Sequence, residues 1–215
     1  MKEGYTLITG ASKGIGLELT KIFAKNHHNL ILVARSKDVL IKLKDNLTKE
    51  YNIKIEVIVA DLTIHNVATE IYQKTKELGC RVDYLINNAG FGDCGHFEET
   101  SLDKDIQMIH TNIIAYHILT KLYLKEMIKK DSGRILNVAS TAAFLPGPLM
   151  STYYSTKSYV YELTTAIFEE LRRIKSNVKV SVLCPGPVNT NFNNVAGVNF
   201  AIKGLSSDYV TSYAL

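Results

Sequence analysis

The chain has 215 residues, of which 46% are hydrophobic and 21% charged, and it carries a formal net charge of +4. This length is that of one domain with a substantial core, and the composition is typical of a globular protein in water. The positive charge is mild and is spread over several expected helices, which argues against a nucleic-acid partner.

Membrane, secretory and metal-binding classes are also disfavoured. No apolar run approaches the ~18 residues of a membrane span, and the N-terminus enters an apolar strand without a signal-peptide pattern. The cysteines at 80, 94 and 184 are odd in number and far apart, and the six histidines show no ligand spacing. We therefore expect no disulfide framework, no metal, no membrane partner and a cytoplasmic location.

Short apolar runs rich in β-branched residues alternate with longer amphipathic stretches, which predicts successive strand–helix units. Strands are expected at about 5–9, 29–34, 54–60, 82–87, 133–139 and 178–184, and helices at about 14–26, 37–50, 64–78, 101–130 (in two pieces) and 153–175. The fold class is α/β: a single Rossmann-type, doubly wound parallel sheet of about six strands flanked by helices on both faces. Because such sheets bind ligands beyond the carboxyl ends of their strands, functional residues should lie in the loops that follow strands.

The first of these loops is rich in glycine and precedes a helix. It reads Thr9-Gly10-Ala11-Ser12-Lys13-Gly14-Ile15-Gly16. Glycines let the backbone turn sharply and approach a pyrophosphate, and the helix N-terminus offers unpaired N–H groups to the anion. The spacing departs from the common Gly-x-Gly-x-x-Gly fingerprint. Its position still predicts a dinucleotide site, with a tight connection that binds no ligand as the alternative.

The end of the second strand bears on the choice of dinucleotide. An acidic residue there would hold a free ribose 2′-hydroxyl, but Ala34 occupies the position and Arg35 follows it. Lys13 in the glycine-rich loop is a second cation that can reach the same place. Together the two cations favour the extra phosphate of NADP(H), unless Arg35 merely pairs with Asp38 on the surface.

Three later loops add candidate cofactor contacts. Asp61-Leu62, after the third strand, could face the adenine, although an aspartate there would also cap the next helix. Asn87-Asn88-Ala89-Gly90 can place amides against the cofactor, or it can be a turn chosen for its backbone geometry. Cys184-Pro185-Gly186-Pro187-Val188-Asn189-Thr190 is stiff, and Thr190 could hydrogen-bond the amide of a nicotinamide.

Tyr153 and Lys157 lie four residues apart on one face of the last long helix, so they can act on one bound molecule. Lowering the pKa of a tyrosine by about three units needs about 4 kcal/mol, much of which an adjacent cation in a dry site could supply. A packed tyrosine beside a solvated lysine is the plainer alternative. Ser140, at the end of the fifth strand, is near enough in the chain to share a pocket. Asn112 is a poor helix former inside a helix, so we expect it to use its side chain or backbone.

These motifs together resemble the classical short-chain dehydrogenase/reductase family. The resemblance covers residues 1–190 and includes the set Asn112, Ser140, Tyr153 and Lys157. It implies hydride transfer between a nicotinamide and a small carbonyl or alcohol substrate. By the same resemblance Tyr153 is the general acid/base, Ser140 binds the substrate oxygen, and Lys157 binds the nicotinamide ribose and lowers the tyrosine pKa. Asn112 would hold a water that links Lys157 to bulk solvent.

The resemblance also divides the chain. Residues 1–190 are expected to form the NADP-binding catalytic domain, and residues 191–215 a substrate lid and a shortened C-terminal segment. Members of the family usually continue with a further helix and strand, so the sheet is expected either to end on an exposed strand at 178–184 or to be completed by a neighbouring chain. The alternative function is a catalytically impaired or regulatory NADP-binding protein with an incomplete pocket. A nucleotide-sugar epimerase fits less well.

Substrate identity and assembly are predicted only as classes. The expected pocket is apolar and suits an aliphatic or aromatic ketone, a 3-oxoacyl group or a steroid-like ring; its lining would be Phe91, Cys94, His96, Phe144, Leu145, Pro146, Leu149, Met150 and Phe192. Tyr154 is expected to be a pocket wall or a core residue. Apolar residues beyond one core stripe on 101–130 and 153–175 predict, with the resemblance, a homodimer or a higher homo-oligomer.

Overall fold

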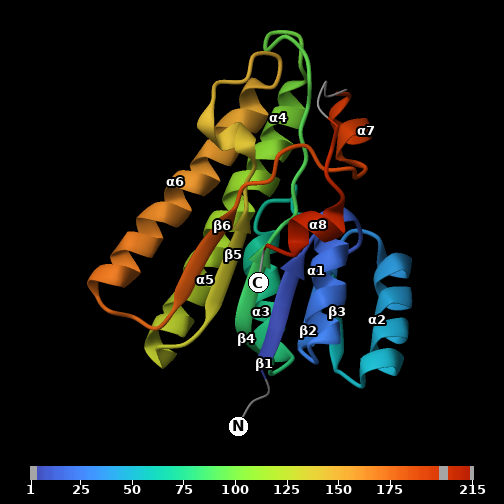
Figure 1. Cartoon of the computed structure of the whole chain (residues 1–215), viewed down its shortest axis with the longest axis vertical. Helices are drawn as coiled ribbons and strands as arrows, with labels where there is room; N and C mark the ends of the chain where they lie inside the picture. The colour runs from blue at the N-terminus through green and yellow to red at the C-terminus, as the bar shows by residue number, and fades with distance from the viewer. Residues whose placement is uncertain (1–3, 199–202, 214–215) are drawn as a thin grey trace.

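A parallel sheet with the strand order β3-β2-β1-β4-β5-β6 forms the centre of the computed structural model, which describes residues 4–198 and 203–213 (Figure 1). Each of the six expected strands is confirmed to within one residue at either end. The strands are β1 (Gly4–Thr9), β2 (Asn29–Ala34), β3 (Ile55–Val59), β4 (Arg81–Asn87), β5 (Arg134–Val138) and β6 (Lys179–Leu183). In the described part of the chain β6 pairs with β5 alone, so the sheet ends there as expected.

Helices connect the strands and cover both faces of the sheet. They are α1 (Gly14–Lys25), α2 (Lys37–Tyr51), α3 (Val67–Glu77), α4 (Leu102–Ile109), α5 (Ala115–Lys130), α6 (Ser151–Arg173), α7 (Phe192–Ala196) and α8 (Ser207–Thr211). A π-helical turn, η1 (His110–Ile114), joins α4 to α5, and a 3-10 turn, η2 (Thr141–Phe144), precedes α6. The expected division of 101–130 into two pieces is therefore confirmed. Between Gly4 and Val198 and in 203–213, no helix is both long and apolar enough to cross a membrane.

Side chains that alternate along each strand build two cores. Leu7 of β1 packs with Ile71 of α3 and Leu119 of α5, whereas the next residue, Ile8, packs with Leu19 of α1 and with α2 on the other face. Because both faces are covered, the strands read as nearly continuous apolar runs. This explains why the strands were predictable from sequence.

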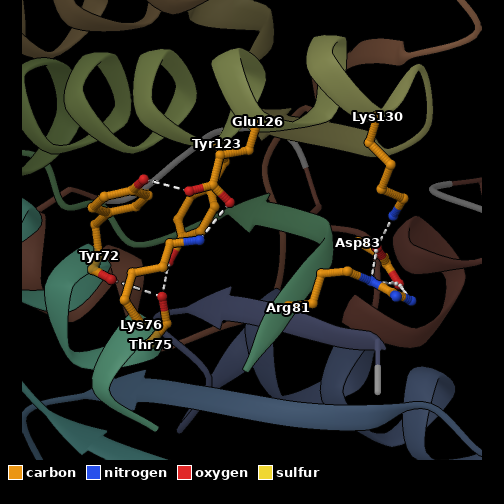
Figure 2. A network of polar contacts seen from close by, with 8 residues as sticks. All are labelled: Tyr72, Thr75, Lys76, Arg81, Asp83, Tyr123, Glu126 and Lys130. Carbon is orange, nitrogen blue, oxygen red and sulfur yellow. Dashed lines mark hydrogen bonds and ion pairs between the residues drawn. The ribbon is translucent and has the colours of Figure 1, made fainter. Parts of the chain in front are cut away.

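A polar network away from the carboxyl ends of the strands fastens α3 to α5 (Figure 2). Glu126 of α5 accepts hydrogen bonds from Tyr72 and Lys76 of α3. The hydroxyls of Thr75 and Tyr123 meet at 2.9 Å beside it. None of these residues lines the cavity described below, so the network serves the packing of this face.

The C-terminal part of the described chain returns to the centre of the molecule. Val188 and Leu205 form a parallel bridge, in which Asn189 N–H donates to the Leu205 carbonyl at 2.8 Å. α8 then packs against α1, with Val210 5% exposed and Thr211 fully buried. The described segment 203–213 is thus attached both to the loop after β6 and to α1.

Candidate active site

A cavity of about 530 Å³ opens beyond the carboxyl ends of the strands. It lies where the strand order reverses between β1 and β4, which is the position at which doubly wound sheets bind their ligands. Eighteen of the twenty sequence-predicted site residues line it: Gly10, Ser12, Lys13, Gly14, Ile15, Arg35, Asp61, Leu62, Asn88, Ala89, Gly90, Ser140, Tyr153, Lys157, Pro185, Gly186, Val188 and Thr190. The other two, Gly16 and Asn112, lie just behind its wall.

The glycine-rich loop is shaped by close backbone approaches. Gly10 and Gly14 have φ values of +67° and +54°, which side-chain-bearing residues rarely adopt. A Cβ at Gly16 would lie 2.2 Å from the Gly10 carbonyl oxygen, so only glycine lets the first turn of α1 pack under the loop. At Gly10 and Gly14 the loop therefore presents backbone without a side chain to the cavity.

Asn88 holds this loop to the end of β4. Its Nδ2 donates to the Thr9 carbonyl at 3.0 Å, and its backbone N–H donates to the Thr9 hydroxyl at 2.9 Å. The N–H of Ala89 donates to the same hydroxyl at 3.1 Å. Asn88 thus lines the cavity and also joins the two central strands through these hydrogen bonds.

Both predicted cations, Lys13 and Arg35, line the cavity, and Arg35 lies beside the loop after β3. Arg35 is 74% exposed, and its Nη1 lies 3.9 Å from Asp61 Oδ2. Asp61 accepts through Oδ1 from the N–H and the hydroxyl of Thr63, at 3.0 and 2.9 Å. Asp61 therefore shapes the loop after β3 and does not cap α3, which begins at Val67. The ion pair with Arg35 is long and exposed, so it contributes little to stability.

Tyr153 and Lys157 are buried side by side on α6, with 8% and 4% of their surfaces exposed. The Lys157 Nζ lies 5.8 Å from the centre of the Tyr153 ring and donates to the Val138 carbonyl at 2.9 Å. That carbonyl is the last of β5, so the sheet itself positions the ammonium group.

Burial dominates the acid–base properties of both groups. It raises the pKa of Tyr153 to about 12, while the hydrogen bond with Ser140 acts in the opposite direction. It lowers the pKa of Lys157 to about 8, against the weaker effect of the neighbouring Cys184. The predicted lowering of the tyrosine pKa by Lys157 is not seen here, because desolvation of the phenol is the largest influence on that pKa. At neutral pH Tyr153 is a neutral acid and Lys157 is still largely an ammonium.

Ser140 lies where β5 passes into η2. Its Oγ accepts from the Ala142 N–H at 3.1 Å and donates to the Pro185 carbonyl at 3.3 Å. The hydroxyl therefore touches both the loop after β6 and, through its contact with Tyr153, the face of α6.

Asn112 is fully buried in the π-helical turn η1. Its Nδ2 donates to the Phe91 carbonyl at 2.9 Å and to the Thr156 hydroxyl at 3.0 Å, and its Oδ1 accepts from the Phe91 N–H at 3.2 Å. The side chain thus joins the loop after β4 to α6 on the far side of Lys157. The expectation that this helical asparagine uses its side chain is confirmed.

The substrate side of the cavity is only partly as predicted. Phe91, Met150, Phe192 and the expected wall residue Tyr154 line it, and the Phe192 ring lies 5.1 Å from that of Tyr153. The other predicted lining residues, Cys94, His96, Phe144, Leu145, Pro146 and Leu149, do not line it. The turn η2 directs Phe144 onto the Tyr161 ring of α6, at 4.8 Å, and leaves Leu145 68% exposed. Sequence reasoning also missed Thr111, Asn193 and Val195, which line the cavity but carry no motif.

The family model described as short chain dehydrogenase matches residues 5–198. The chain belongs to the short-chain dehydrogenase family. The described residues contain no group of three or more histidine, cysteine or acidic side chains that could hold a metal ion.

Similar proteins support this assignment. This short-chain dehydrogenase is 33% identical over 183 residues to the ketoacyl reductase HetN of a Nostoc species, covering 85% of this chain and 63% of that one. Its structure matches a short-chain dehydrogenase from Sphingobium yanoikuyae in complex with NADPH (TM-score 0.91, 30% identity, 99% of this chain and 82% of that one). It also matches the bulky-bulky ketone specific alcohol dehydrogenase of Comamonas testosteroni (TM-score 0.86, 28% identity, 100% and 82%).

The curated relatives are longer than this chain. It spans 63% of HetN and 54% of the rat very-long-chain 3-oxoacyl-CoA reductase, to which it is 28% identical. The activity, substrate and partners of this protein are therefore matters of proposal.

Proposed function

We propose that this short-chain dehydrogenase is an NADP(H)-dependent oxidoreductase that interconverts a carbonyl and an alcohol. The observation that supports this best is that Ser140, Tyr153 and Lys157 open into the same cavity as the glycine-rich loop. The nicotinamide, when bound, supplies or accepts the hydride. The protein then needs to seat the dinucleotide, orient one carbon and move one proton.

The residues present fit the dinucleotide. The loop from Gly10 to Gly16 offers bare backbone and the N-terminus of α1 to a pyrophosphate, and the cavity runs from Arg35 at one end to Tyr153 at the other. Lys157 would hold the nicotinamide ribose, and Thr190, which lies against Gly14, would bind near the nicotinamide.

The proton chemistry follows from the pKa values. Tyr153 is neutral below pH about 12 and can give its proton to a developing alkoxide. Ser140 would turn its hydroxyl from Pro185 to the same oxygen and stabilise the developing charge. The Lys157 ammonium, protonated below pH about 8, would stabilise the phenolate that remains. Asn112 would carry a water that returns the proton from solvent.

A matched pair of variants tests the role of Tyr153. Tyr153→Phe should lower turnover of a ketone with NADPH by ~10²-fold or more, since it removes the general acid. The dissociation constant for NADPH should change less than about twofold. Tyr154→Phe, one residue away on the same cavity wall, is the control and should keep most activity. A Tyr153→Phe protein that remains active would refute the mechanism.

The preference for NADP(H) rests on charge. Ala34 leaves room where an acidic residue would repel a phosphate, and Arg35 can exchange its weak contact with Asp61 for a 2′-phosphate. Arg35→Ala should weaken NADPH binding by about tenfold and leave NADH binding unchanged. Lys37→Ala, an exposed neighbour that does not line the cavity, is the control. Equal affinity of the wild type for both cofactors would contradict the preference.

For the substrate we propose a bulky apolar ketone or 3-oxoacyl group. The walls nearest Tyr153 are Phe91, Met150, Tyr154 and Phe192, which offer apolar and aromatic surface and no buried charge. Two of the similar proteins are named for ketoacyl and bulky ketone substrates. A panel of ketones of increasing size, followed by the loss of NADPH absorbance, would test this. Faster turnover of acetone-sized substrates than of bulky ones would contradict it.

A homodimer is proposed on the exposed apolar surface of α5 and α6. Tyr159 is 37% and Phe168 53% exposed, and Ile114 at the start of this face is 39% exposed. Light scattering after size exclusion should give twice the mass of one chain, and Phe168→Glu should shift it towards a monomer.

A further inference from the structure

Thr111 has a buried hydroxyl that no group in the described protein satisfies. The residue is 6% exposed, its Oγ1 has no hydrogen-bond partner, and it lines the cavity. A buried polar atom left without a partner is uncommon in a native protein and calls for an explanation.

The other buried threonines show that this is an exception within the chain. Nine threonines are buried in the described residues, and the eight besides Thr111 each make a side-chain hydrogen bond; these are Thr6, Thr9, Thr20, Thr75, Thr120, Thr156, Thr164 and Thr211. Two of them, Thr20 and Thr164, bond the carbonyl four residues earlier in their own helix, at 2.8 and 2.6 Å. Thr111 is also helical, yet it does not do so.

The neighbours of Thr111 place it beside the loop after β3. The preceding residue, His110, packs edge-on against His65 of the loop after β3, with ring centres 5.9 Å apart. Leu62 and Thr63 of that loop line the same cavity. The following residue, Asn112, is bonded to the backbone of Phe91 after β4. Thr111 therefore lies between the ends of β3 and β4, in the part of the cavity that the loop after β3 lines.

We propose that the Thr111 hydroxyl is a hydrogen-bonding contact for the adenosine part of the dinucleotide, made to a purine nitrogen or a ribose hydroxyl. This rests on the proposed function, because it assumes that a dinucleotide occupies the cavity. A threonine hydroxyl can donate or accept, so either group would satisfy it. The protein leaves the hydroxyl unpaired in order to pair it with the ligand.

The proposal predicts that removal of the Thr111 hydroxyl weakens the binding of NADPH without lowering the thermal stability of the unliganded protein. Thr111→Val has nearly the same shape and removes only the hydroxyl. The valine protein, without ligand, should melt at the wild-type temperature or above it, because no internal hydrogen bond is lost. Its dissociation constant for NADPH, measured by calorimetry, should rise by about five- to tenfold. Thr111→Ser should restore most of the affinity.

Fragments of the cofactor locate the contact. Adenosine 2′,5′-bisphosphate should lose affinity for Thr111→Val by the same factor as NADPH, whereas nicotinamide mononucleotide should bind both proteins equally. Thr75→Val is the matched control: its hydroxyl bonds the Tyr72 carbonyl and the Tyr123 hydroxyl far from the cavity. That variant should melt lower and bind NADPH as the wild type does.

The outcomes distinguish this inference from the proposed function. If wild type binds NADPH and Thr111→Val binds it equally well, the inference is wrong and the function stands. A lower melting temperature for unliganded Thr111→Val would also overturn it, since the hydroxyl would then have an internal partner. If wild type binds neither NADPH nor NADH, the proposed function fails and this inference fails with it.

Discussion

Replacement of Lys157 by methionine should stabilise the protein while it abolishes catalysis. The ammonium is 4% exposed, and burial lowers its pKa from 10.5 to about 8. This difference corresponds to a cost of about 3 kcal/mol in the folded state at neutral pH. The substitution also removes the hydrogen bond to the Val138 carbonyl, which costs about 1 kcal/mol. The expected net gain in the free energy of unfolding is about 2 kcal/mol at pH 7.

The free energy of unfolding of the wild type should also change with pH in a direction that the Lys157 pKa fixes. Below pH about 8 the lysine is protonated in both the folded and the unfolded chain, so the folded protein bears the full free-energy cost of burying the ammonium. Between pH about 8 and 10.5 the folded chain has released the proton and the unfolded chain still holds it. The free energy of unfolding of the wild type therefore rises with pH across this window. The advantage of Lys157→Met should shrink over the same range.

Urea denaturation of both proteins at a series of pH values measures the difference directly, because groups common to both cancel. Lys42→Met, at an exposed position on α2, controls for the loss of a positive charge and should change stability little. A Lys157→Met protein less stable than wild type at pH 7, or a difference that does not vary up to pH 10.5, would refute the reasoning.

Three further substitutions test other parts of the site. Asn88→Ala removes the amide that holds the glycine-rich loop to β4, so the free energy of unfolding should fall by about 1–3 kcal/mol and NADPH should bind more weakly, as denaturation and calorimetry would show. Phe192→Ala uncovers the Tyr153 ring and should raise kcat/KM for bulky ketones relative to small ones in a steady-state assay; an unchanged ratio would contradict a role in selection. Thr164→Val removes a 2.9 Å hydrogen bond from Asn137 under the site, and thermal melting should show a loss of about 1 kcal/mol.

The parts of the molecule that sequence predicted are those governed by local rules. Strands buried on both faces produce short apolar runs, and the turn between β1 and α1 requires glycine at Gly10 and Gly14 because of their positive φ. Tyr153 and Lys157 are four residues apart, and helical geometry alone places such residues on one face. These features needed no knowledge of what packs around them.

The features that sequence did not predict depend on neighbours distant in the chain. Asn88 lines the cavity as expected, but sequence did not predict that the nearness of β1 and β4 gives its amide a partner on Thr9. Phe144 was expected in the pocket, but η2 turns it onto α6. The pKa of Tyr153 depends on how completely the surrounding side chains exclude water, and no motif records this. Thr111 was missed because its distinguishing property is a hydrogen bond that it does not make within the protein.

The bridge between Val188 and Leu205 and the contact of α8 with α1 attach the chain next to the pocket wall to the rest of the protein. Val188 lines the cavity and lies only four residues before Phe192, whose ring packs against that of Tyr153. The position of this aromatic wall therefore depends on how the chain after β6 is attached, as well as on the side chains that touch it.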